Sequence, residues 1–250
     1  MPEQPANPSP SARDRVYATQ RAHVGDFRFD AGVAEVFADM IARSVPGYAL
    51  TLQMIAVLTR RFARPGTHCH DLGCALGAST LAIARHAPAG CRVIGVDNSA
   101  EMVERARAII ATDEACARIE IHCADVREVA LESASLITLN FTLQFVPPEE
   151  RASLLARIAA ALLPGAALVL SEKIAFGDPQ EQELLGTLHH DFKQLQGYSA
   201  LEIAQKRTAL ENVMIPETLA THRQRLLDAG FSRVSVWMQC LNFASLLAVK

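Results

Sequence analysis

Three acidic side chains stand where short apolar segments of the sequence end, and the first of them opens a turn with two glycines. Asp71 begins DLGCALG, Asp97 ends RVIGVD and Asp125 follows IEIHCA. The turn has the spacing D-x-G-x-x-x-G and lacks the G-x-G-x-x-G pattern that holds a dinucleotide pyrophosphate. Asp97 comes twenty positions after Gly77, where a carboxylate accepts hydrogen bonds from ribose hydroxyls and repels a 2'-phosphate. These residues predict a site for an adenosine without a phosphate tail, which describes S-adenosylmethionine.

The segments that position these residues are of two alternating types. Short apolar runs, namely HCHDLG, RVIGVD, IEIHC, ASLITLN and AALVLSEK, are mostly separated by amphipathic helical patterns such as AEMVERARAIIA. This alternation is typical of βαβ units in a doubly wound, mostly parallel sheet. The ligand of such a sheet lies outside the carboxyl ends of its strands. We therefore expect Asp97, Asp125 and Asn140 to meet at one site.

The chain departs from this alternation at three places. Residues 33–62 carry two helical patterns ahead of the sheet, residues 176–216 form a helical insertion, and VSVWMQCLNFASLLAVK predicts an antiparallel closing hairpin. An insertion that follows the carboxyl end of a strand lies beside the ligand site. We expect residues 13–250 to form a single α/β domain and the Pro-rich residues 1–12 to form a disordered tail.

Composition narrows the classes of partner. A chain of 250 residues that is 50% hydrophobic, with a net charge of -3, favours a globular domain and argues against direct binding to nucleic acid. The six cysteines include no C-x-x-C pair, which is typical of thiols in a reducing compartment. No apolar run reaches the length of a membrane span. We expect a cytoplasmic protein with no membrane partner.

One cluster of metal-binding residue types occurs in the first apolar run. His68 and His70 flank Cys69, and all three side chains are ligands that zinc accepts. In a strand, however, the two histidines point to one face and the cysteine to the other. We therefore expect no metal cofactor.

The whole arrangement, including LLPGAALVLSE and the closing hairpin, resembles the class I S-adenosylmethionine-dependent methyltransferase fold, a Rossmann-like, seven-stranded sheet. Segments outside the core narrow the resemblance: FDAGVAEVFADMIARSVPGY, LNFTLQFVPPEER, HHDFK, GYSALEIAQKR and LENVM. From about Gly25 to Lys250 the chain resembles the carboxy-S-adenosyl-L-methionine synthase family. Members of that family convert S-adenosylmethionine and prephenate to carboxy-S-adenosyl-L-methionine and phenylpyruvate. A partner enzyme then uses the product in the 5-oxyacetic acid modification of the tRNA wobble uridine.

The resemblance also implies residues for the first part of the adenosyl ligand. Tyr48 of SVPGY would close over the ligand, and Gly73, Cys74 and Ala75 would lie against its amino-acid part. Ala75 departs from the small hydroxyl residue expected there. This change removes one hydrogen bond at most, because the backbone at that position still has its polar groups.

The remaining contacts implied by the resemblance follow the strand ends. Asp97 and Asn98 would hold the ribose, Asp125 and Val126 would frame the adenine, and Asn140 would lie near the sulfonium.

Arg207 of QKR is the one residue to which the resemblance gives a catalytic role, as the group that meets the new carboxylate. A guanidinium stays charged and offers a planar fork to a carboxylate. Without the resemblance, Arg207 beside Lys206 is more simply a solvated helix charge. His189 and His190 are further acid–base candidates. The leucine stripe on their helix, Leu184, Leu188 and Leu195 with Phe192, suggests instead that they flank a packed face.

Three other functions remain open. An ordinary small-molecule methyltransferase would have the same fold and cofactor. A nicotinamide dehydrogenase would need the missing glycine pattern. A non-catalytic adenosyl-binding partner of a tRNA-modifying enzyme would bind the ligand without turnover. The resemblance further implies a homodimer, with the helical insertion as the interface and Arg207 crossing into the neighbouring site.

Overall fold

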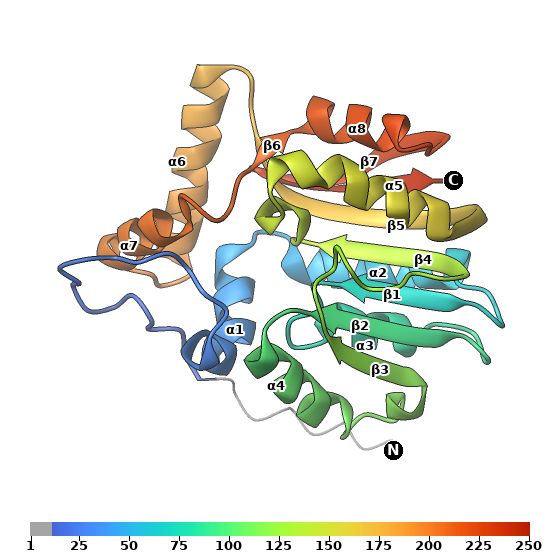
Figure 1. The fold of residues 1–250 in the computed structure, drawn as a ribbon. Helices are drawn as coiled ribbons and strands as arrows, with labels where there is room; N and C mark the ends of the chain where they lie inside the picture. Colours follow the sequence, from blue (N-terminus) through green and yellow to red (C-terminus); the bar gives the residue numbers. More distant parts are fainter. Residues whose placement is uncertain (1–11) are drawn as a thin grey trace, which may run out of the picture.

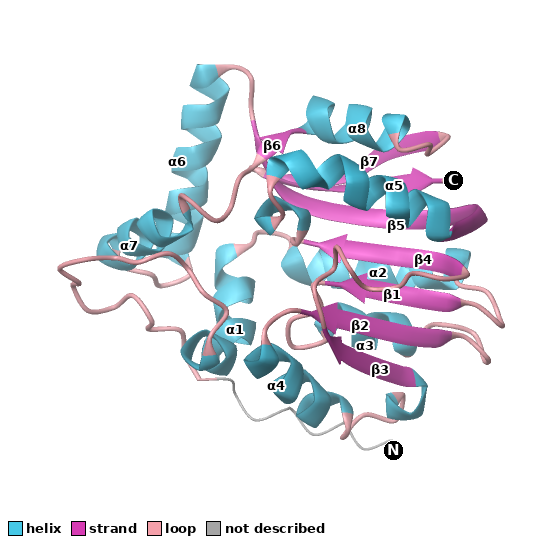
Figure 2. Ribbon diagram, in the orientation of Figure 1, coloured by secondary structure: helices cyan, strands magenta, loops and turns pink. Residues whose placement is uncertain are grey.

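The computed structural model describes residues 12–250, so the expected disordered tail lies almost wholly outside the described residues. Its centre is a sheet with the strand order β3-β2-β1-β4-β5-β8-β7 (Figures 1 and 2). The first five strands in this order are parallel, and β8 is antiparallel to both of its neighbours. The predicted doubly wound sheet with an antiparallel closing hairpin is confirmed. The strands are β1 (His68–Leu72), β2 (Arg92–Asp97), β3 (Ile119–Cys123), β4 (Ala134–Asn140), β5 (Leu162–Ala175), β7 (Arg233–Cys240) and β8 (Phe243–Val249).

An eighth strand escaped the sequence pattern. The two-residue β6 (Glu217–Thr218) pairs with the end of β5, beside Ile174 and Ala175. Two residues are too few for a hydrophobic period to show. The strand matters because it ties the end of the helical insertion back to the sheet.

Helices cover both faces of the sheet. Figure 1 shows α2 (Tyr48–Phe62) and α3 (Ala78–Ala84) behind the sheet, and α5 (Arg151–Ala161) and α8 (Leu219–Asp228) in front of it. The helix α4 (Ala100–Ile110) packs near the β3 edge, against Cys74 and Ile121. Short 3-10 turns occupy Cys116–Arg118, Leu143–Phe145 and Pro148–Glu150. This three-layer arrangement places the carboxyl ends of the five parallel strands along the same edge of the sheet.

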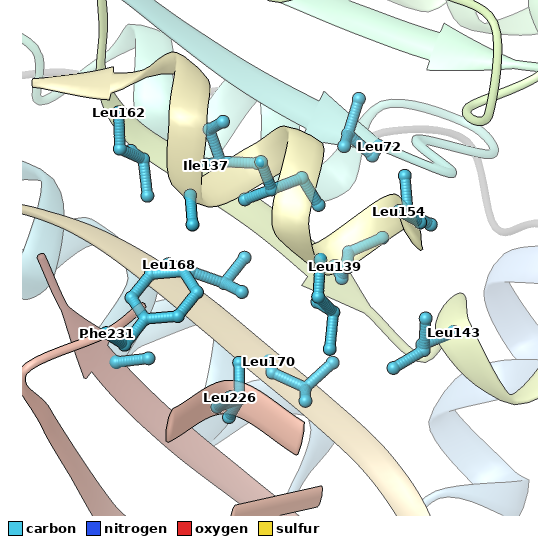
Figure 3. Packing of buried hydrophobic residues seen from close by; sticks show 14 of the residues in the cluster. Leu72, Ile137, Leu139, Leu143, Leu154, Leu162, Leu168, Leu170, Leu226 and Phe231 are labelled. Carbon is cyan, nitrogen blue, oxygen red and sulfur yellow. The ribbon is translucent and has the colours of Figure 1, made fainter. Parts of the chain in front are cut away.

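The largest core cluster lies between β4, β5 and the two front helices (Figure 3). Leu139 and Leu168 come from the strands, Leu154 from α5 and Leu226 from α8, and each is at most 1% exposed. Central parallel strands are covered on both faces and so carry nearly continuous apolar runs. This rigid centre fixes the positions of the strand ends.

Three helices stand beyond the carboxyl ends of the parallel strands (Figure 1). They are α1 (Ala31–Ser44), α6 (Pro179–Leu195) and α7 (Ala200–Leu210). Their starts follow ordinary capping chemistry: Asp30 caps α1, Asp178 caps α6, and Ser199 forms a capping box with Glu202 on α7. Within residues 12–250 no single helix is long and apolar enough to cross a membrane, and only α1 and α2, bent by 95°, pass such a test as a pair.

The segment that precedes α1 is attached to α7. The Gln205 side-chain amide donates to the carbonyls of Tyr17 and Thr19, each at 2.9 Å, and its oxygen accepts from the Arg21 N–H at 2.8 Å. Phe27 N–H donates to the Ala209 carbonyl at 2.8 Å. The N-terminal segment and the helical insertion thus form one continuous wall opposite the strand ends.

Candidate active site

A cavity of about 1100 Å³ lies between the strand ends and the wall formed by α1, α6 and α7. Binding pockets for one drug-sized ligand are usually about 300 to 1,000 Å³, so this cavity has room for two small ligands side by side. All ten site residues expected from the sequence line it: Tyr48, Gly73, Cys74, Ala75, Asp97, Asn98, Asp125, Val126, Asn140 and Arg207.

The glycine turn between β1 and α3 forms the floor of the cavity. Gly73 has a φ of +80°, and a Cβ at this position would collide with the Thr142 side chain. The N–H groups of Gly73 and Cys74 both donate to the Val96 carbonyl, at 2.7 and 2.9 Å. Glycine is required here by its left-handed backbone and by the close side chain of Thr142.

Asp97 is held rigidly at the end of β2. Its Oδ2 accepts from the Ala75 N–H at 2.9 Å and its Oδ1 accepts from the Ser99 N–H at 3.0 Å. Burial raises the pKa of Asp97, and these backbone donors oppose the rise. Each carboxylate oxygen has a second lone pair, which leaves acceptor capacity for hydroxyl groups. Because the Ala75 N–H already donates to Asp97, it is not free to replace the hydrogen bond of the missing hydroxyl group.

Asp71, the first of the three acids, has a different role from the other two. It is 0% exposed and is not among the residues that line the cavity. Its carboxylate accepts from Thr80 Oγ1 at 2.6 Å and from Thr138 Oγ1 at 2.7 Å. Asp71 therefore joins α3 and β4 to β1 below the cavity.

Asp125 lies two residues beyond β3 and is paired with a cation. Arg127 donates through Nε to Oδ1 at 2.9 Å and through Nη2 to Oδ2 at 2.6 Å, and this bond to Arg127 lowers the pKa of Asp125. Arg127 also bonds Glu150 and lines the cavity. Sequence reasoning missed Arg127, since nothing in its spacing distinguishes it from a surface arginine. Val126, beside it, is 9% exposed.

Asn140 has one satisfied and one unsatisfied side-chain group. Its Nδ2 donates to Ser79 Oγ at 2.9 Å, while its buried Oδ1 has no partner among residues 12–250. A buried acceptor without a partner costs free energy. The polarised C–H groups next to a sulfonium are weak donors that such an oxygen can accept, so the residue fits S-adenosylmethionine.

Aromatic side chains close the side of the cavity formed by α1 and α2. Tyr48 is the first residue of α2, its ring lies 6.3 Å from that of Phe141, and burial raises its pKa. Phe29 packs edge-on against Phe145 at 5.3 Å. These rings give the cavity an apolar lining, and electrostatic interactions are stronger in such surroundings than in water.

The helix α6 turns its histidines, and not its leucines, toward the cavity. Leu184, Leu188 and Leu195 are 59%, 40% and 84% exposed, so the expected packed leucine face is not found within one chain. His189 is buried instead, and its Nε2 lies 2.8 Å from the Ser44 carbonyl oxygen. Burial lowers its pKa to about 3, so the ring is neutral near pH 7. The partly buried His190 lines the cavity beside it.

Arg207 lies on α7, lines the cavity and is exposed. Its guanidinium forms no ion pair within the described part of the chain. The neighbouring Lys206 is enclosed, with Nζ 3.0 Å from Ser44 Oγ and 3.9 Å from Asp14 Oδ2. The two adjacent cations therefore differ: one is held inside the fold and one remains free for a ligand.

Groups of three or more metal-binding side chains do not occur within residues 12–250. In β1, His68 Nδ1 lies 3.1 Å from the Glu132 carbonyl oxygen, and both ring nitrogens of His70 are buried. Cys69 points elsewhere, with its Sγ 3.4 Å from that of Cys91.

This fold, with a nucleoside-sized site at the strand ends, defines the class of S-adenosylmethionine-dependent methyltransferase folds. A family described as a methyltransferase domain matches residues 69–165. The structure of human N-acetylserotonin methyltransferase in complex with S-adenosylmethionine superimposes with a TM-score of 0.60 at 19% identity, covering 88% of this chain and 55% of that one. An O-methyltransferase family protein from Burkholderia thailandensis gives 0.62 at 16% identity, covering 89% and 60%. Identities this low show the fold alone.

Sequence relatives narrow this class. The carboxy-S-adenosyl-L-methionine synthase of Marinobacter nauticus is 54% identical over 97% of this chain and 97% of its own length. That of Erwinia tasmaniensis is 54% identical over 96% of this chain and 98% of its own length. The chain belongs to the carboxy-S-adenosyl-L-methionine synthase family, and it is an enzyme with a methyltransferase fold.

Proposed function

We propose that the protein converts S-adenosylmethionine and prephenate to carboxy-S-adenosyl-L-methionine and phenylpyruvate. Besides family membership, the observation that carries this proposal is the division of one cavity into two ends. Asp97 and Asn140 lie at the ends of β2 and β4, whereas Lys193 and Arg207 lie on α6 and α7 of the opposite wall, and Lys173 lies near the end of β5. A methyl donor with a polar nucleoside suits the first end, and a doubly anionic substrate suits the second.

The reaction balances without a side-chain nucleophile. Prephenate loses its ring carboxyl as carbon dioxide and its ring hydroxyl as hydroxide, driven by formation of an aromatic ring. The hydroxide removes a proton from the methyl group of the sulfonium, giving water and an ylide. The ylide carbon attacks carbon dioxide and forms the new carboxylate. The protein must align the two substrates and exclude water.

The residues of the cavity meet these demands separately. Asp97 orients the ribose, and the aromatic wall around Tyr48 and Phe145 excludes water. Arg207, exposed on α7, meets the new carboxylate with a charged planar fork. His189 is a poor base because its ring is buried and bonded to a backbone carbonyl. The hydroxide released from prephenate supplies the base instead.

Isotope transfer tests the proposal directly. Prephenate labelled with carbon-13 in the ring carboxyl is incubated with the purified protein and S-adenosylmethionine, and the products are followed by mass spectrometry. We expect the label in carboxy-S-adenosyl-L-methionine, together with phenylpyruvate formed faster than in an enzyme-free control. Demethylated cofactor with a methylated product would favour an ordinary methyltransferase. Ligand binding without turnover would favour a non-catalytic adenosyl-binding partner.

The proposal also covers the use of the product and the oligomeric state of the enzyme. The product would be used in the cytoplasm by a tRNA carboxymethyltransferase, without direct contact between this chain and nucleic acid. A homodimer is part of the proposal, supported by the exposed leucines of α6. Arg207, which is exposed on the adjacent α7, would then serve either its own site or that of the neighbouring copy.

A further inference from the structure

Lysine is rare in this chain and is concentrated at one place. The sequence has only Lys173, Lys193, Lys206 and Lys250, while most of its 24 basic residues are arginine. The first three of these four lysines line the cavity. A lysine ammonium is a compact charge on a flexible stem, so the cavity has basic groups of a kind that the rest of the surface almost lacks.

Packing brings two of these lysines to the same side of the cavity. Lys173 is near the end of β5 and pairs in register with Phe243 of β8. The Phe243 ring packs edge-on against His189 of α6, with ring centroids 5.0 Å apart. Lys193 follows His189 by one helical turn and therefore lies on the same face of α6. Lys173 and Lys193 thus approach the cavity from two elements that are packed together.

The charges of these two lysines are not neutralised by the protein. Within residues 12–250, Nζ of Lys173 and Nζ of Lys193 form no hydrogen bond or ion pair. Burial lowers the pKa of both lysines, and for Lys193, where nearby Lys173, Lys206 and Arg207 add to the effect, it falls to about 7. Lys206 differs, because Asp14 and Ser44 hold it. Among the described residues, these two partly buried amines therefore have no acidic partner.

The acidic residues of the cavity do not supply that counter-charge. Asp97 is bonded to backbone N–H groups, and Asp125 is paired with Arg127. Glu183 is exposed and precedes Lys193 by ten residues of α6, which is about 15 Å along a helix. Glu211 is exposed at the end of α7, one turn beyond Arg207. Among the described residues, the acids that line the cavity therefore leave Lys173 and Lys193 without an ion pair.

We propose that Lys173 and Lys193 form the binding subsite for the carboxylate that prephenate retains, while Arg207 faces the carboxyl group that is transferred. This assignment rests on the proposed function. Two carboxylates on one substrate need two cationic positions, and only one of them ends on carboxy-S-adenosyl-L-methionine. The retained carboxylate leaves with phenylpyruvate, so this product is the matching probe for the lysines.

Calorimetry with separate ligands tests the subsite. Lys173→Gln and Lys193→Gln should each weaken the binding of phenylpyruvate about tenfold or more, the usual effect of losing a hydrogen bond to a charged group. The same variants should bind S-adenosylmethionine as the unchanged protein does. Lys193→Arg should recover part of the loss because it keeps the charge. Lys250→Gln removes one charge outside the cavity and is the matched control.

Chemical labelling gives a second measurement that does not depend on turnover. An amine-selective acetylating reagent at pH 7.5 should modify Lys193 faster than Lys250, and mass spectrometry of the peptides gives both rates. Phenylpyruvate should slow the labelling of Lys173 and Lys193 and leave that of Lys250 unchanged. Equal rates with and without phenylpyruvate would overturn the subsite.

The outcomes separate this inference from the proposed function. If the protein transfers the labelled carboxyl but the lysine variants bind phenylpyruvate normally, the subsite is wrong and the function stands. If the variants lose S-adenosylmethionine and phenylpyruvate alike, the lysines bind the methionine carboxylate or support the fold, and the subsite is again wrong. If no carboxyl transfer occurs but phenylpyruvate binding still depends on both lysines, the anion site stands without the reaction.

Discussion

Asp97 and Asp125 have the same charge at neighbouring strand ends, but their surroundings give them different properties. Asp97 is buried among backbone N–H donors, and its pKa is raised. Asp125 is bound on both oxygens by Arg127, and its pKa is lowered. The carboxylate of Asp97 therefore has lone pairs available for a ligand, whereas the lone pairs of Asp125 are largely occupied. This difference favours Asp97 as the residue that holds the ribose.

Replacing Asp97 with alanine should weaken the binding of S-adenosylmethionine by about 1.5 to 3 kcal/mol, the range for hydrogen bonds to a charged group. Asp97→Asn should lose less, because it keeps one acceptor oxygen. Calorimetry measures both affinities. Thermal unfolding is the control, since the variant also frees the N–H groups of Ala75 and Ser99. Equal affinities in a folded Asp97→Ala variant would refute the ribose assignment.

Arg207 should discriminate between the substrate and the product of carboxylation. Arg207→Ala should weaken the binding of carboxy-S-adenosyl-L-methionine about tenfold more than the binding of S-adenosylmethionine, which has no charge at the reacting carbon. The effect belongs at the low end of the range because the side chain is exposed. Arg207→Lys should recover only part of the discrimination, since it loses the planar fork. A parallel loss for both ligands in calorimetry would assign Arg207 a general supporting role.

At the scale of elements, the segment after β4 depends on one buried acid. Glu172 of β5 is 0% exposed and accepts from the N–H groups of Leu143 and Gln144 at 2.9 and 3.0 Å. Arg151, also 0% exposed, donates to the carbonyls of Val146 and Gln144. Because this segment forms part of the cavity wall, Glu172 and Arg151 position the site without lining it.

Burial raises the pKa of Glu172 to about 8, although the N–H groups of Gln144 and Leu143 and the charge of Arg151 oppose the rise. An unfolded glutamate titrates near pH 4.3. Between these two values the native state holds a proton that the unfolded state has lost, so rising pH lowers the free energy of unfolding.

Denaturant unfolding of Glu172→Gln between pH 5 and 8 tests this linkage. The variant lacks the titration, so its stability should fall less over this range than that of the unchanged protein. At pH 5 it should be less stable by about 1 kcal/mol, because an amide nitrogen then faces a backbone N–H. Glu104→Gln, an exposed change on α4, is the control. Identical pH slopes for Glu172→Gln and the unchanged protein would show that Glu172 is already ionised at pH 5.

Elements with a strong period were predictable from sequence, and contacts between elements were not. The five apolar runs predicted the strands β1 to β5, and the pattern AEMVERARAIIA predicted α4. The start of β5 was not predicted, because the strand begins at Leu162, four residues before the apolar run AALVLSEK, and so includes Gly165. The pairing of Asp125 with Arg127 depends on a fold that periodicity does not describe. The predicted ligand contacts share one cavity, and their roles stay predictions.

At the scale of the whole molecule, the leucines of α6 are exposed and have no packing partner within the described residues of one chain. Leu184, Leu188 and Leu195 share one helical face and are 59%, 40% and 84% exposed. Grouped apolar side chains of this kind mark association surfaces, and a second copy of the chain is the partner we propose. Because α6 also carries Lys193 toward the cavity, association would hold one wall of the site in place.

A pair of charged substitutions on this face tests the dimer. Sedimentation should give the unchanged protein a mass twice the 27.1 kDa of the chain. Leu184→Glu with Leu188→Glu should reduce it to one chain, because carboxylates would have to be buried against apolar partners. Val57→Glu, at a side chain 54% exposed on α2, is the matched control and should stay dimeric. Circular dichroism checks that the double variant is folded.

The affinity of the dissociated chain for carboxy-S-adenosyl-L-methionine then shows whether the second copy completes the site. If dissociation lowers this affinity, the second copy completes the site; if the affinity is unchanged, each chain has a complete site of its own. A monomeric unchanged protein would contradict the dimer and leave the leucine face for another partner.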